Sequence, residues 1–322
     1  MDVTWGVSVN EVAWGGMIAI YLFLAGIAGG AFLTASLTDL LSKKQSPKVI
    51  RSGAYIALLT IIVGLGLLVV DLGRPLSFWK LLLNVNLGSV MSIGVFIVSG
   101  FTGLSFVYSY LVWSTAAEQK HIHITSTNTE VAASENTEIA AASVNTDVAA
   151  TSVGQGIQVF RKPVAVLGVL FSIATATYTG FLLSAVSTNN FWHTPFLGIE
   201  AIPFLPILFL VSAASTGLAA TMIGALNSGD LAVYKKADMV LIIVEIALIS
   251  ILYLSVKSIF FTGSMAILFW LGVVSLGLII PLLLSIYGIT KHKNVILPVC
   301  SMVIIGGLCL RYFVVYTGQL FK

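Results

Sequence analysis

Eight long apolar runs, each long enough to cross a lipid bilayer as a helix, constrain the fold of this protein most strongly. A membrane-spanning helix needs about 20 apolar residues. The runs are continuous and show no two-residue alternation, which excludes a transmembrane β-barrel. The sequence therefore predicts an all-α, polytopic membrane protein with eight transmembrane helices. The runs cover residues 14–37, 53–70, 89–113, 163–186, 203–226, 238–256, 264–288 and 295–317.

The overall composition leads to the same class. Of the 322 residues, 58% are hydrophobic and 9% are charged, whereas soluble domains carry about 25% charged residues. The net charge of +3 is not gathered into a basic tract, so nothing indicates a nucleic-acid partner. The first apolar run follows the acidic, aromatic residues Asp2, Trp5 and Glu11 rather than a basic segment. We therefore expect a short exposed arm there instead of a cleaved signal peptide.

The distribution of basic residues predicts the orientation of the protein. Cytoplasmic connections of membrane proteins carry an excess of Lys and Arg. Alternate connections between the runs hold eleven of the 16 basic residues, and the opposite side holds five. We therefore expect both termini outside, on the periplasmic side. The eleven are Lys43, Lys44, Lys48, Arg51, Lys120, Arg161, Lys162, Lys235, Lys236, Lys291 and Lys293, and the five are Arg74, Lys80, Lys257, Arg311 and Lys322.

A low-complexity segment over residues 114–162 divides the sequence. It repeats a small, polar, acidic unit beginning at Asn128, Asn136 and Asn145. Such units bury too little apolar surface to offset the entropy of ordering. We predict a disordered cytoplasmic loop or a weak helix. The sequence then has three parts. Residues 1–113 hold helices 1–3 and the outer segment 71–88, residues 114–162 form this loop, and residues 163–322 hold helices 4–8.

The helices are expected to pack as two four-helix bundles. A faint parallel repeat, Leu22–Ala28 against Leu208–Ala214, supports an internal duplication. Gly26 and Gly30 lie four residues apart in the first run, and small residues at this spacing let helices approach closely. We interpret these glycines as packing positions.

The four histidines, His121, His123, His193 and His292, all fall in connections. A haem b buried in a membrane usually needs histidine ligands on facing helices. The two cysteines, nine residues apart in the last run, form no iron–sulfur framework. We therefore expect no haem, iron–sulfur cluster or metal site in this protein.

Charged and aromatic residues gather at the predicted outer rim. The segment from Asp71 to Lys80 holds an acid, two bases and a tryptophan. Trp14 and Tyr21 lie seven residues apart and so share a helix face, and a buried phenol needs a hydrogen-bond partner. His193 could transfer protons near neutral pH or could simply be an interfacial loop residue. A pocket of these groups, with Tyr178, would suit a flat, apolar molecule with carbonyl ends, such as a quinone.

Ionisable residues inside the runs form a second candidate set. A charge in lipid costs at least about 2.5–3.5 kcal/mol, so each should face the bundle interior beside a partner. One interpretation is a proton route, and the other is a buried polar lock between helices. The residues are Glu245, Arg311, Asp39 and Asp238.

Five motifs in order resemble the NrfD/PsrC family, the polysulfide-reductase-type membrane subunits. Together they span nearly the whole sequence apart from 114–162. The motifs are Trp14 with Tyr21–Gly30, the segment Asp71-Leu72-Gly73-Arg74-Pro75 with Phe78-Trp79-Lys80, Tyr178–Ser184 with Trp192–Pro195, Leu205–Ala213, and Arg311–Val315 with Gly318-Gln319.

This resemblance implies a haem-free subunit that exchanges electrons between menaquinone or ubiquinone and a four-cluster ferredoxin-like iron–sulfur subunit. A molybdopterin subunit or a multihaem cytochrome c would complete the complex. Tyr21 and Asp71 become the candidates for the first proton acceptor. By the same resemblance, quinone binding is assigned to Trp14, Tyr21, Arg74, Tyr178 and His193, and partner docking to Arg74, Trp79 and Lys80.

Two other functions are compatible with the sequence. Glu245 and the parallel repeat would also suit a transporter or proton-translocating subunit. Against this, helices 1, 3, 5 and 7 carry no charge within their apolar runs and no run is broken. A passive membrane tether would not need the charged cluster at 71–80, so this function is disfavoured.

Overall fold

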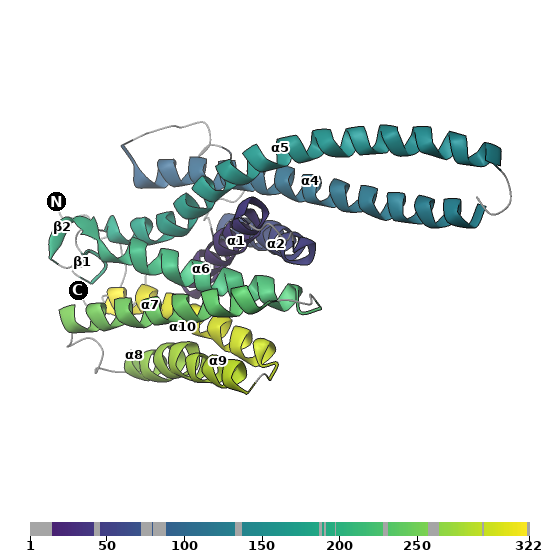
Figure 1. The fold of residues 1–322 in the computed structure, drawn as a ribbon. Helices are drawn as coiled ribbons and strands as arrows, with labels where there is room; N and C mark the ends of the chain where they lie inside the picture. Colours follow the sequence, from purple (N-terminus) through teal and green to yellow (C-terminus); the bar gives the residue numbers. More distant parts are fainter. Residues whose placement is uncertain are drawn as a thin grey trace.

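The structure is a computed structural model, and it describes residues 15–41, 46–71, 79, 88–132, 137–186, 189, 191–196, 198–227, 231–256, 264–291 and 293–320. Within residues 116–159, 200–201, 264 and 320 it describes the backbone alone. The part of the protein described is almost entirely helical, as Figure 1 shows.

Eight helices are long and apolar enough to cross a membrane, which confirms the predicted all-α, polytopic class. Two of them begin six residues before the predicted apolar run, at 47 instead of 53 and at 232 instead of 238. Polar residues at headgroup depth can continue a helix, so hydropathy alone underestimates its length. The helices are α1 (Gly16–Leu41), α2 (Pro47–Asp71), α4 (Val90–Ala132), α5 (Thr137–Ser184), α6 (Phe204–Gly224), α7 (Ala232–Ser255), α8 (Ser264–Ile267), η3 (Leu268–Ile279), α9 (Ile280–Thr290) and α10 (Ile296–Leu320).

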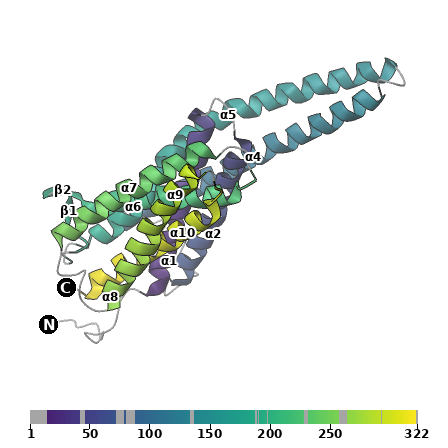
Figure 2. The same cartoon turned by 60° about the horizontal axis from the view of Figure 1, so that its bottom comes forward.

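The low-complexity segment is mainly helical. Of the two possibilities, loop or weak helix, the backbone adopts the helix: α4 continues to Ala132 and α5 begins at Thr137. The two helices run side by side and extend beyond the others, which both views make plain (Figures 1 and 2). Residues 133–136 between them lie outside the described part.

The seventh span contains a feature that hydropathy does not predict. It consists of α8, η3 and α9 in continuous succession, and η3 is a π-helix. The hydroxyl of Ser275 donates a hydrogen bond to the carbonyl of Trp270, five residues earlier, at 2.8 Å. A π-helix is wider than an α-helix and is rare at this length. The hydrophobic periodicity of an apolar run is too weak to distinguish a π-helix from an α-helix.

A short antiparallel hairpin precedes α6. Its strands are β1 (Pro195–Phe196) and β2 (Ile199–Pro203), with Pro195 opposite Pro203. Gly198, between the strands, has a φ of 80°, a conformation that glycine adopts without steric cost. The sequence prediction left 187–202 as a connection without strands.

Helix α1 is central, because it packs against α2, α5, α6 and α10. Its closest approach is to α6, where Gly30 lies against the backbone of Ala213 and Gly217 so tightly that a Cβ at position 30 would overlap it. The prediction that glycines of the first run serve helix packing is thus confirmed for Gly30. This contact brings the two halves of the faint repeat together.

The buried side chains form two clusters. One includes Phe32, Ile61 and Phe101, from α1, α2 and α4. The other centres on α6, α7, η3 and α10, with Phe209 and Phe313 among its members. Helix α1 contributes to both, so the predicted grouping into two four-helix bundles stays a prediction, as does the orientation of the termini.

Candidate functional site

Three of the predicted site residues come together where α1, α2 and α5 meet. Tyr21 lies in the second turn of α1, Asp71 is the last residue of α2, and Tyr178 lies two turns before the end of α5. Asp71 and Tyr178 are both close enough to Tyr21 to interact with it electrostatically. Tyr21 and Tyr178 are partly buried, whereas Asp71 is exposed. These three residues are called the Tyr21 group below.

A glycine of α4 makes room for Tyr178. Gly94 is buried, and a Cβ built on it would overlap the phenol ring and hydroxyl of Tyr178. Any side chain at position 94 would therefore displace the ring. Gly94 could not be singled out from the sequence, because an apolar run with several glycines does not indicate which side chain of another helix faces each glycine.

Much of the predicted rim lies outside the described residues. Trp14, Arg74 and Lys80 are among these, as is all of 72–78 and 80–87. Trp79 is described and is 48% exposed. The assignment of quinone binding or partner docking to these residues stays a prediction.

The connection after α5 is fastened to α10. The indole Nε1 of Trp192 donates to the carbonyl of Val314 at 2.8 Å, and the amide of Asn189 donates to the carbonyl of Gly318. The Asn189 side-chain oxygen accepts from the backbone N–H of Phe191 and of Trp192, both at 3.1 Å. These bonds fix the position of the loop relative to the end of α10.

His193 follows this anchored tryptophan but points elsewhere. Its Nδ1 lies 3.0 Å from the Ser184 carbonyl, and its side chain is exposed. Because a carbonyl only accepts hydrogen bonds, Nδ1 is the donor in this contact. The structure places His193 on the surface loop and groups Tyr21 with Asp71 and Tyr178 instead.

Glu245 and Arg311 form a second, fully internal group. Glu245 of α7 is 5% exposed and Arg311 of α10 is 2% exposed. The guanidinium lies 3.6 Å from the centre of the Phe209 ring, and its Nη2 donates to the Phe209 carbonyl at 3.1 Å. Ser212 and Arg311 are both near enough to Glu245 to interact with it. The Nε and Nη1 atoms of Arg311 have no hydrogen-bond partner among the described residues.

Asp238 belongs to the same group and lies seven residues before Glu245. Residues seven apart share a helix face, and Asp238 lies close enough to Glu245 to interact with it electrostatically. Asp238 is 1% exposed, and its Oδ1 has no partner within the described part of the protein. Three ionisable side chains thus lie along the interior between α6, α7 and α10.

Asp39, the fourth residue of the predicted proton route, lies in a separate cluster. Arg161 of α5 holds its carboxylate in two hydrogen bonds, Nε to Oδ2 at 2.9 Å and Nη2 to Oδ1 at 2.5 Å. The Tyr108 hydroxyl donates to Oδ2 at 3.2 Å. Asp39, Tyr108 and Arg161 are all buried. This geometry is that of a polar lock between α1, α4 and α5.

Comparison with known proteins decides the family. Residues 7–322 match the family described as "Polysulphide reductase, NrfD". The protein belongs to the NrfD family. The resemblance that the five motifs carry is therefore confirmed, and the match includes the segment 114–162.

Relatives within the NrfD family include subunits of bacterial reductases. One of the polysulfide reductase chains of Wolinella succinogenes is 30% identical, over 100% of the present sequence and 99% of the relative. An NrfD homolog of Haemophilus influenzae is 29% identical over 96% and 95%. One of the selenate reductase subunits of Mesobacillus selenatarsenatis is 24% identical over 94% and 73%. With its eight apolar helices, the protein is a multi-pass protein of the bacterial inner membrane, related to the membrane subunits of reductase complexes.

The described residues of this family member contain no group of three or more His, Cys, Asp or Glu that could hold a metal ion. Cys300 and Cys309 are free thiols on α10. Among the described residues, the Tyr21 group supplies phenols and a carboxylate, and the internal group around Glu245 supplies buried charges. Both sets suit proton transfer, because each holds hydroxyl or carboxyl groups inside an apolar surrounding.

Proposed function

We propose that this protein is the quinone-reactive membrane subunit of an oxidoreductase complex. It exchanges electrons between a membrane quinol or quinone and an iron–sulfur subunit that docks beside the Tyr21 group. The observation that carries the proposal is the meeting of Tyr21, Tyr178 and Asp71 at the ends of α1, α2 and α5. Membership of a family that includes reductase subunits supports it.

The chemistry of these side chains fits a quinol. Oxidation of a quinol to a quinone releases two electrons and two protons. A phenol hydroxyl can hydrogen-bond either a quinone carbonyl or a quinol hydroxyl. In our proposal Tyr21 orients the quinone ring and Tyr178 supports it. The exposed carboxylate of Asp71 accepts the two protons one after the other, directly or through Tyr21, and passes each to water, while the two electrons go to the iron–sulfur partner.

The site needs an electron acceptor from another subunit. A four-cluster ferredoxin-like subunit is the proposed partner, joined by a molybdopterin subunit or a multihaem cytochrome c. We propose that it docks on the surface that carries Arg74, Trp79 and Lys80, and that this surface faces the periplasm. The half-exposed Trp79 offers an attachment point for a cross-linker. A Trp79→Cys variant should cross-link to the partner, whereas a Val233→Cys variant, exposed at the first turn of α7, should not.

Quinol turnover tests the proposal. Tyr21→Phe, Tyr178→Phe and Asp71→Asn should each lower inhibitor-sensitive quinol oxidation by the purified complex. Tyr55→Phe and Tyr110→Phe are the matched controls, because these tyrosines are 39% and 63% exposed on α2 and α4. If the complex shows no quinol turnover, or if the three site variants behave like the controls, the proposal fails.

A second function, proton translocation, is favoured by one observation. Asp238, Glu245 and Arg311 are buried in one region of α7 and α10, and atoms of Asp238 and Arg311 lack partners among the described residues. Buried ionisable groups in membrane spans often mark proton paths. We propose this role for these three residues and not for Asp39, which Arg161 holds. Glu245→Gln should abolish pH changes across vesicles and spare electron transfer if protons follow this path.

A further inference from the structure

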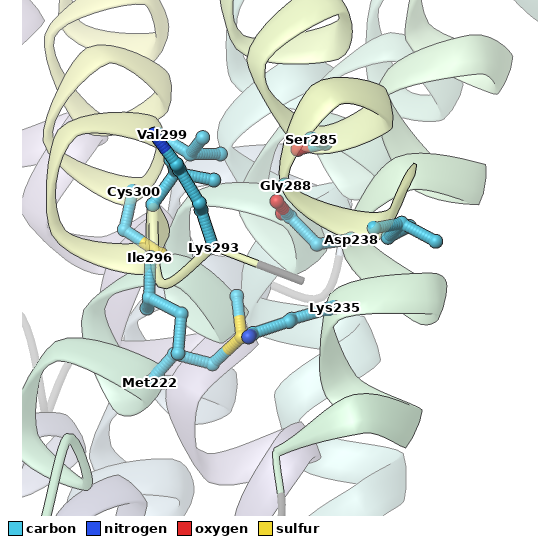
Figure 3. A pocket seen from close by; sticks show the side chains of 11 residues that line it. Met222, Lys235, Asp238, Ser285, Gly288, Lys293, Ile296, Val299 and Cys300 are labelled. Carbon is cyan, nitrogen blue, oxygen red and sulfur yellow. The ribbon is translucent and has the colours of Figure 1, made fainter. Parts of the chain in front are cut away.

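A small pocket, with a cavity volume of about 20 Å³, lies at the opposite ends of the helices from the Tyr21 group. It is bounded by the first turns of α7 and α10, the last turn of α9 and the end of α6. Figure 3 shows the side chains of Lys235, Asp238 and Lys293 gathered around it. This pocket involves neither the quinone site nor the docking surface proposed above, but it shares Asp238 with the proposed proton path.

The polar groups of the pocket have both signs of charge. Lys235 comes from α7, and Lys293 comes from the turn between α9 and α10. Asp238 supplies a carboxylate that is 1% exposed and whose Oδ1 has no hydrogen-bond partner among the residues that the structure describes. Burying an acceptor without a partner is costly. A water molecule or the hydrogen-bond donor of a ligand would satisfy this oxygen, and the pocket has room for one group of that size.

Apart from the hydroxyl of Ser285 and the thiol of Cys300, the remaining walls are apolar. Met222, Val295, Ile296 and Val299 line them. Beyond the pocket, α7 and α9 contact each other. Their outer faces carry exposed apolar side chains at Val240 (54%), Val244 (40%), Leu283 (60%) and Ile286 (45%). A lipid acyl tail could lie along this surface, while the lysines sit at helix ends, the usual depth of lipid headgroups.

We propose that the pocket takes the ammonium of a phosphoethanolamine lipid at Asp238, while the phosphate of the same headgroup lies outside the cavity, between Lys235 and Lys293. The ammonium donates up to three hydrogen bonds and satisfies the buried carboxylate. The phosphate oxygens accept from both lysines. An anion alone would be repelled by Asp238, and a cation alone by the lysines, so a zwitterion fits the set of charges best.

Lipid exchange with the full-length protein tests this site. The protein would be placed in nanodiscs containing phosphatidylethanolamine, phosphatidylcholine or phosphatidylglycerol, and retained lipid would be measured by native mass spectrometry. We expect selective retention of phosphatidylethanolamine, because a trimethylated headgroup has no N–H to donate and a glycerol headgroup has no cation. Asp238→Asn should weaken retention at least about tenfold, equivalent to about 1.4 kcal/mol.

Two pairs of lysines provide matched variants. Lys235→Gln and Lys293→Gln remove the phosphate contacts, and Lys293 is exposed, so its replacement should not disturb folding. Lys236→Gln and Lys291→Gln are the controls, because both are exposed neighbours that do not line the pocket. The first pair should weaken retention of the lipid, and the second pair should leave it unchanged.

Three results would overturn the proposal. Equal retention of phosphatidylcholine would mean that only the apolar surface of α7 and α9 attracts lipid. Competition by free phosphoethanolamine at the same affinity would mean that the site serves a soluble zwitterion and not a membrane lipid. Absence of retained lipid, with altered vesicle pH changes in Asp238→Asn, would make the pocket a water-filled opening to Glu245.

Discussion

Arg161 of α5 donates two hydrogen bonds to the carboxylate of Asp39 of α1, and both side chains are buried. This pair joins residues 122 positions apart in the sequence. The hydroxyl of Tyr108 of α4 donates a third hydrogen bond to the Asp39 carboxylate, so three helices meet at this group. From the sequence, Arg161 was expected in a cytoplasmic connection, and Asp39 either in a proton route or in a buried polar lock.

Breaking this pair should destabilise the protein strongly. In Arg161→Gln the carboxylate of Asp39 stays buried without its cation, and a loss of about 3–5 kcal/mol is expected. Thermal unfolding of the purified protein would measure it. Lys162→Gln, the exposed neighbour, should change stability little. Equal stability of the two variants would show that the pair is not a structural lock.

Gly94 should control the position of Tyr178. In Gly94→Ala the new methyl group overlaps the phenol, so the ring must move. Misplacement of a substrate-orienting group by about 1 Å can cost about 100-fold in rate, and we expect roughly a 10–100-fold decrease in kcat/KM for quinol. The control is Gly103→Ala on the same helix, where a Cβ meets nothing within 4 Å. Similar kinetics in both variants would exclude a role for Tyr178 in quinol turnover.

Glu245 and Arg311 should depend on each other for stability. Arg311→Met removes the cation near a buried carboxylate and should cost about 3–5 kcal/mol. In the double variant with Glu245→Gln no charge is left alone, so the cost should be smaller than the sum of the two single changes. A double-mutant cycle on thermal or denaturant unfolding measures this coupling. Strict additivity would show that the two side chains act independently.

Asn189 should hold the loop before the hairpin. Its side chain bonds the backbone of Phe191, Trp192 and Gly318. Asn189→Ala leaves these buried groups without partners, at a cost of about 1–3 kcal/mol. Hydrogen exchange at the amides of Phe191 and Trp192 should accelerate. The control is Ile199→Ala, because Ile199 is 51% exposed in β2, and it should leave these amides protected.

Within the candidate site, the sequence indicated the residue types but only part of the grouping. Tyr21 and Tyr178 stood out by their place at the predicted outer rim and in the family motifs, and the structure brings them together with Asp71. Gly94 and Arg161 did not stand out. Gly94 lies in an ordinary glycine-containing apolar run, and Arg161 lies at the edge of a polar segment. Their roles depend on the side chains that face them from other helices, Tyr178 and Asp39.

Sequence alone determined the number of membrane spans and the helical class, because a bilayer requires about 20 apolar residues per helix and internal satisfaction of every backbone hydrogen bond. It also determined the family, through motifs distributed over the whole protein. Tertiary structure decided the partners of the charged residues: Asp39 with Arg161, Glu245 with Arg311, and Asp238 at a pocket. These partners come from helices far apart in the sequence, and the uniform hydropathy of the spans does not encode which helix faces which.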